Sequence, residues 1–145
     1  MSTFSENVRS ALYTKLNVSG VTSIFATGGV HYKVAPPDAA QPYRLVIFDR
    51  VPGTVDYALG NNLVGERDLW LIKAITEQDS STAYEPPFLA YQILAACETA
   101  IGGTLSPSSG TVSIARRRSD MPPFIKDQGD RQIWHLGFYL DVYVG

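Results

Sequence analysis

The clearest pattern of apolar and polar positions lies at the end of the chain, over residues 134–144. Apolar side chains occupy every even position there, and polar, small or tyrosine side chains occupy the odd positions. The even row consists of Trp134, Leu136, Phe138, Leu140, Val142 and Val144. Alternation with a period of two is typical of a strand that buries one face. We therefore expect a half-buried last strand whose even row faces the core.

The longest helical pattern covers residues 86–101. Apolar side chains recur there at helical spacing, at Ala90, Ile93, Leu94, Cys97 and Ile101. Two prolines suit the first turn, where their missing N–H has no partner, and Gly102-Gly103 suits the end. Because this helix is apolar on most of its circumference, we expect a sheet to cover it, with the even row of the last strand as its partner.

The remaining periodic segments complete the expected fold. A first helix is predicted over 4–16, with a capping box formed by Thr3 and Glu6. Further elements are expected as a short turn over 21–26 and as strands over 30–34, 43–48, 69–72 and 111–115. The strands at 43–48 and 69–72 are expected to pair antiparallel. The order predicts an α+β fold, a mostly antiparallel sheet of four to five strands with two helices packed on one face.

Two long turn-rich segments interrupt these elements. We expect long loops at 50–62, which contains Pro52-Gly53, and at 119–130, which contains Pro122-Pro123. A shorter loop is expected at 106–110. Because long loops in compact domains are often functional, both are predicted to mediate contacts between subunits or with another component of an assembly. Deleting either is predicted to preserve the fold, because neither is expected to supply core residues.

Composition limits the class of protein. A chain of 145 residues is expected to form one domain over 1–145. A formal net charge of -2 does not favour nucleic acid or an anionic membrane as a partner. The first residues lack the basic and apolar regions of a signal peptide, so a cytoplasm is the expected compartment. The single cysteine, Cys97, lies on the apolar side of the 86–101 helix and is expected to be a core residue.

A search for catalytic chemistry finds little. The two histidines, His31 and His135, have no second ligand at metal-binding spacing. No serine has the context of a nucleophile elbow and no glycine-rich loop has the lysine of a P-loop. We therefore expect no catalytic residue, cofactor or metal, and no enzyme. A small ligand-binding or enzymatic domain stays as an alternative, seeded by His31 with Asp38 or His135 with Asp141.

The residues most typical of protein interfaces lie in the loops and on the odd face of the last strand. Tyrosine and arginine are enriched at interfaces. The only charge cluster, Arg116–Arg118, is either a strand end in solvent or a contact with acidic groups. Asp120, Asp127 and Asp130 are near enough in sequence to neutralise it. The expected interface residues are Val55, Asp56, Tyr57, Arg116, Arg117, Arg118, Met121, Phe124, Tyr139 and Tyr143. The odd face with the last two tyrosines is expected to be open or to be covered by a partner.

The order of these parts resembles a known family. The first helix around Val8–Leu16, the Ala-Pro-Pro … Pro-Tyr connection over 35–43 and the strand centred on Trp70 carry the likeness. The long helix ending near Gly102 and the alternating strand after Asp130-Arg131 continue it. The chain resembles the tail-terminator, or tail-completion, proteins of long-tailed bacteriophages and phage-like particles. It departs from shorter members in its extended segments at 50–62 and 119–130.

This resemblance implies a structural role in a virion. Such proteins form a homo-oligomeric ring, typically of six subunits, that caps the tail tube and joins the tail to the head. The implied partners are the tail tube protein and head-completion or connector proteins, and genomic DNA passes through the lumen without sequence-specific binding. The implied location is the virion tail or neck, with the host cytoplasm during assembly. Another phage neck or minor tail component is the alternative within the same class.

Overall fold

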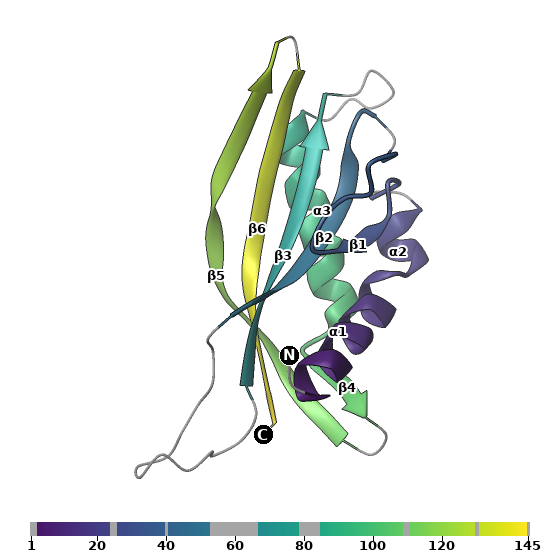
Figure 1. Cartoon of the computed structure of the whole chain (residues 1–145), viewed down its shortest axis with the longest axis vertical. Coiled ribbons are helices and arrows are strands. Elements are labelled where there is room, and N and C mark those ends of the chain that lie inside the picture. Colours follow the sequence, from purple (N-terminus) through teal and green to yellow (C-terminus); the bar gives the residue numbers. More distant parts are fainter. Residues whose placement is uncertain are drawn as a thin grey trace.

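The described part of the chain forms one mixed sheet and three helices (Figure 1). A computed structural model describes residues 3–23, 26–39, 41–52, 67–78, 85–108, 111–129 and 131–144. The helices are α1 (Thr3–Leu16), α2 (Ser19–Thr22) and α3 (Pro86–Ile101). The strands are β1 (Val30–Tyr32), β2 (Arg44–Val51), β3 (Arg67–Glu77), β4 (Thr104–Ser108), β5 (Thr111–Gln128) and β6 (Arg131–Val144). The expected α+β class is confirmed, with six described strands in place of four to five.

The sheet has the order β1-β2-β3-β6-β5-β4, and every pair in it is antiparallel except β1 with β2. β2 and β3 pair as predicted, with Phe48 opposite Ile72. The last strand, β6, therefore lies inside the sheet between β3 and β5. From Leu136 to Val142 its even row is buried as predicted, with Phe138 and Val142 fully buried, while Trp134 is half-buried.

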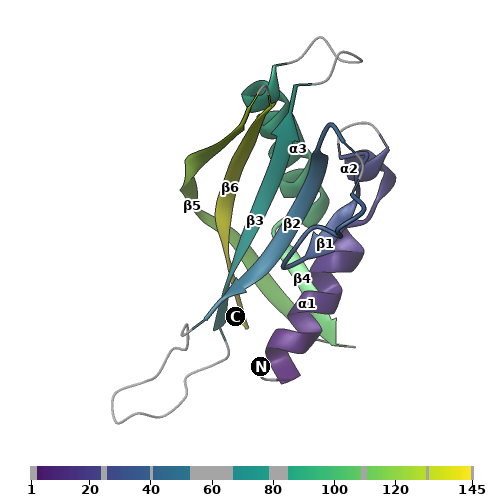
Figure 2. The ribbon, with the colours of Figure 1, turned by 45° about the horizontal axis from the view of Figure 1, so that its top comes forward.

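The helices pack on one face of the sheet, called the inner face below (Figure 2). α3 has the predicted bounds, and Gly102 ends it at a φ of 69°, a left-handed conformation that glycine adopts without strain. The α1 side chains Val8 and Leu12 join the same core as Ile93 of α3. Cys97 is buried in this core, as predicted, and its burial raises the pKa of the thiol to about 12.

The segment 119–130 is the main correction to the sequence analysis. It was expected to be a loop, but residues 119–128 form the second half of β5 and pair with β6 as far as Gln128 opposite Arg131. β4 pairs with β5 only as far as Ile114, so the rest of β5 is an edge strand. Pro122 and Pro123 lie within a register shift of this edge, where the missing N–H groups break no ladder bond. Deleting the segment would therefore remove a strand, which contradicts the expectation that the fold would survive.

Two further strand boundaries differ from those predicted from the sequence. Part of the expected loop at 106–110 belongs to β4, which starts directly after the glycines that end α3. β2 runs to Val51, two residues into the expected loop at 50–62. The rest of that loop, including Val55, Asp56 and Tyr57, lies outside the described residues.

Gly137 marks a close approach between β6 and β3. A Cβ atom at this position would lie 2.6 Å from the backbone oxygen of Ile72 and 3.2 Å from the Cα of Lys73. Both are backbone atoms, so neither can turn away as a flexible side chain would. This position in the centre of the sheet therefore depends on glycine.

We expect Gly137→Ala to lower the free energy of unfolding by about 1–3 kcal/mol, because the added methyl group forces the two strands apart. Urea unfolding followed by circular dichroism measures the change. Gly20→Ala is the matched control, because its Cβ would meet nothing within 4 Å and Gly20 lies in helix α2. Equal effects at the two positions would contradict the close approach.

We expect Phe138→Ala to lower the free energy of unfolding by about 3–5 kcal/mol, as a fully buried aromatic residue is truncated. The neighbouring change Tyr139→Ala should cost clearly less, because Tyr139 is only half-buried and points to the opposite face. Thermal and urea unfolding of both variants test the assignment. A larger loss from Tyr139→Ala would mean that the faces of β6 are reversed.

Candidate interaction surface

The sheet face opposite the helices, called the outer face below, carries both predicted tyrosines of β6. Tyr139 lies opposite Leu71 of β3 and Ser119 of β5, while Tyr143 lies opposite Arg67 and Ile114. Directly paired residues share a face of a sheet. Both tyrosines are half-buried, and none of the described helices packs on this face. The register therefore brings separate parts of the chain into one surface.

An ion pair crosses this surface. Arg67 of β3 donates two hydrogen bonds to Asp141 of β6, from Nε to Oδ1 at 3.0 Å and from Nη2 to Oδ2 at 2.8 Å. Asp141 is only 9% exposed, so this two-pronged contact satisfies a carboxylate that has lost most of its water. On the other side of Asp141 lies Arg116 of β5. Arg116 is exposed and adds positive charge to the outer face.

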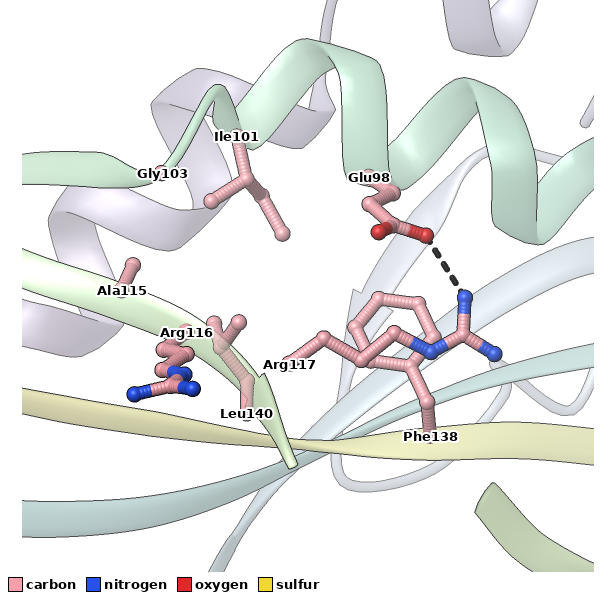
Figure 3. A pocket seen from close by; sticks show the side chains of 8 residues that line it. All are labelled: Glu98, Ile101, Gly103, Ala115, Arg116, Arg117, Phe138 and Leu140. Atoms are coloured by element: carbon pink, nitrogen blue, oxygen red, sulfur yellow. Dashed lines mark hydrogen bonds and ion pairs between the residues drawn. The ribbon is translucent and has the colours of Figure 1, made fainter. Parts of the chain in front are cut away.

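The arginine cluster is thus divided between two faces. Arg117 turns to the inner side, where its guanidinium bonds Glu98 of α3 at 2.6 Å and also pairs with Asp120 (Figure 3). The hydrogen bond to Asp120 raises the pKa of Arg117. Its guanidinium carbon lies 4.8 Å from the centre of the Phe138 ring. Arg117 therefore links β5 to α3. The arginine cluster lies within β5 and is not a strand end.

Two cavities between α3 and β5 border the contact of Arg117 with Glu98. The larger, about 300 Å³, is floored by Ile101, Phe138 and Leu140 and closed on one side by the Arg117–Glu98 pair (Figure 3). The smaller, about 120 Å³, is lined by Tyr91 of α3 and by Met121 of β5. Met121, predicted to be an interface residue, thus borders this cavity and lies opposite Gly137 of β6. Arg118 is exposed at the register shift between Arg117 and Ser119.

A third cavity, called the outer pocket below, hollows the outer face near the start of β6. It measures about 400 Å³ and is mainly apolar. Six of its lining residues are Tyr43, Leu45, Ile75, Phe124, Ile133 and His135. The predicted interface residue Phe124 is 56% exposed, and its ring meets the edge of His135 at 5.3 Å between centres.

The outer face is therefore partly covered at this end. Leu45, Ile47, Ile75 and Ile133 form a second, small apolar cluster there. Ala35, Ala39 and Tyr43 pack against it from the segment that precedes β2. This face is predicted from the sequence to be open or covered by a partner. The Ala-Pro-Pro … Pro-Tyr connection instead shields one end and forms a wall of the outer pocket.

A buried carboxylate holds that wall in place. Glu77 at the end of β3 is 5% exposed and accepts two hydrogen bonds from Arg131, at 2.9 and 2.7 Å. It also accepts a bond from the backbone N–H of Tyr43 at 2.8 Å. The hydrogen bond to Glu77 raises the pKa of Arg131, whose guanidinium also lies 5.3 Å from the Tyr43 ring centre. Sequence reasoning did not identify Glu77 or Arg131, because they are 54 residues apart and no local pattern links them.

Of the two histidine pairs that seeded the enzymatic alternative, His135 and Asp141 do not form a site. His31 Nε2 contacts the backbone oxygen of Gly28 at 2.8 Å. His135 and Asp141 are six residues apart on one strand, about 20 Å at ~3.3 Å per residue, and Asp141 is engaged by Arg67. Within the described ranges, no three His, Cys, Asp or Glu residues are placed to hold a metal ion. Among the helices described, none has the length and apolar character to cross a membrane.

Comparison with solved structures finds the same fold in a phage-like particle. A chain from the "Virion of native gene transfer agent (GTA) particle" matches with a TM-score of 0.56 and 20% identity, over 94% of each chain. Another solved structure, whose description states no function, matches with a TM-score of 0.58 and 14% identity, over 100% of this chain and 96% of the other. No family model matches the sequence, and no curated protein matches it. The chain thus shares its fold, over nearly its full length, with a virion protein.

We expect the stability of the protein to fall between pH 6.5 and pH 4 partly because of His135. Burial, with the charges of Lys73 and Lys126, lowers the pKa of His135 from 6.5 to about 4. In that window the unfolded chain binds a proton that the folded chain does not, so acid favours unfolding. His135→Gln should lose less stability than the wild type when urea midpoints at pH 7 and pH 4.5 are compared. Equal losses would contradict the shift.

Proposed function

We propose that this protein is a tail-terminator-type component of a phage or phage-like particle. Its subunits form a ring of six that caps the finished tail tube and joins the tail to the head. The observation that carries the proposal is the fold shared with a chain of a gene transfer agent virion over 94% of both chains. The resemblance of the sequence to tail terminators supplies the more specific role.

The surface supports an assembly role over a catalytic one. The large half-buried residues of the outer face, such as Tyr139, Tyr143 and Leu71, suit a protein contact. The lining residues of the outer pocket and of the two α3–β5 cavities include no serine, threonine or cysteine. In the proposed ring, tube protein and head-completion or connector proteins bind its two ends, and DNA passes through the lumen without sequence-specific contacts.

A second candidate within the same class is another neck or minor tail component. It is favoured by the same observation, because the matching chain is described only as part of a virion. The two candidates differ in position. A terminator occupies the head-proximal end of the tube, whereas a minor tail component lies elsewhere along the tail.

The proposal is tested by measuring whether the subunits assemble into a ring and where on the tail tube the protein binds. We expect light scattering on size-exclusion fractions to give a mass near six times the 15.9 kDa subunit, at high concentration or once tail tubes are added. Negative-stain images with gold-labelled protein should then show label at one end of each tube. Intact particles, whose tube ends are already occupied, are the control and should stay unlabelled. A protein that remains monomeric and does not associate with tubes would refute the proposal, and label at the distal end would favour the second candidate.

A further inference from the structure

Two exposed aromatic side chains lie in the first two turns of α3. Tyr91 is 60% exposed and Phe88, one turn before it, is 48% exposed. The exposed Glu85 precedes the helix and adds a negative charge beside the two rings. Helical residues three apart share a face. Two large rings and one carboxylate therefore form a single protruding patch on the helix side of the molecule, called the α3 patch below.

The outer pocket has the complementary character. Its volume of about 400 Å³ lies within the ~300–1,000 Å³ of cavities that bind organic groups. Its walls are the apolar parts of Leu45, Ile75 and Phe124, so it suits an aromatic ring. Lys126 lines it and supplies a positive charge at its wall, whereas the nearby Lys73 is partly offset by Asp49. Glu77, the buried carboxylate beside it, is already bound by Arg131.

The two surfaces lie back to back at the same level of the sheet. Thr76 Oγ1 donates a hydrogen bond of 2.8 Å to the backbone oxygen of Pro86, which ties the first turn of α3 to the inner face of β3. The preceding residue, Ile75, faces the outer side and lines the outer pocket. Figure 1 likewise shows α3 starting near the end of β3. Tyr91 is five residues along the helix from Pro86, a rise of about 7.5 Å.

We propose that the α3 patch of one subunit docks into the outer pocket of a second copy of this chain, with Tyr91 as the inserted ring and Glu85 beside Lys126. This contact rests on the proposed function only for the number of subunits. It joins two different surfaces, so each copy contacts one neighbour through its α3 patch and another through its outer pocket. Contacts of this kind close into a ring when neighbouring copies are related by a rotation that closes without a rise along the axis, and otherwise produce a filament.

Cross-linking tests the contact directly. One variant carries Tyr91→Cys, and a second, longer by a tag, carries Phe124→Cys. They are mixed and treated with a short bismaleimide. Cys97 is 0% exposed and does not compete. We expect heterodimers in several-fold excess over a control mixture of Tyr13→Cys with Phe124→Cys, because Tyr13 is also an exposed ring, at 45%, but lies on α1. Heterodimers at the control level, or homodimers in excess, would overturn the proposal.

A charge exchange provides an independent readout if a cysteine variant folds poorly. Lys126→Glu should reduce self-association in sedimentation, and adding Glu85→Lys to the same chain should restore it. Failure of the second change to restore association would count against the pairing.

The outcomes also separate this contact from the proposed function. Wild-type rings at tube ends without the heterodimer leave the function standing and reject the contact. A heterodimer in a protein that never caps a tube supports the contact and rejects the terminator role.

Discussion

The structure depends on the burial of one face of β6 against α3. Phe138 is fully buried at the middle of this contact, opposite Ile72 on the next strand. On the same face, Phe48 and Trp70 pack with ring centres 6.1 Å apart. Burial of aromatic area of this kind is the largest favourable contribution to such a core. Because side chains alternate along a strand, hiding this row on the helices turns the other row of every strand to the outer face.

Three buried ion pairs join neighbouring strands of the sheet. Asp68, Glu77 and Asp141 are 2%, 5% and 9% exposed, and each carboxylate is bonded by an arginine. Such pairs add little net stability compared with apolar residues, but losing one partner is costly because a buried charge is left alone. Their effect is to hold particular strands in register, and Glu77 with Arg131 also secures the connection before β2 that walls the outer pocket.

The proposed assembly surfaces follow from an asymmetric layer arrangement. The helices cover the inner face only, so the protein presents helices on one side and a sheet with an apolar pocket on the other. A subunit with two unlike sides suits a head-to-tail ring better than a two-fold dimer. The second half of β5 is an edge strand. Its prolines, arginines and register shifts oppose pairing with the edge of another sheet. This edge of β5 is therefore poorly suited to pairing with another strand.

Local periodicity by itself determined the bounds of α3, the buried row of β6 and the α+β class, because helical and strand spacing are properties of neighbouring residues. Only the tertiary structure decided that 119–128 is a strand, since its prolines and charges are tolerated by pairing with β6 and by its place at the edge. The division of Arg116 from Arg117, the outer pocket and the Glu77–Arg131 pair were also decided there. Each joins residues far apart in sequence, and their meeting depends on strand order and register, which no local pattern encodes.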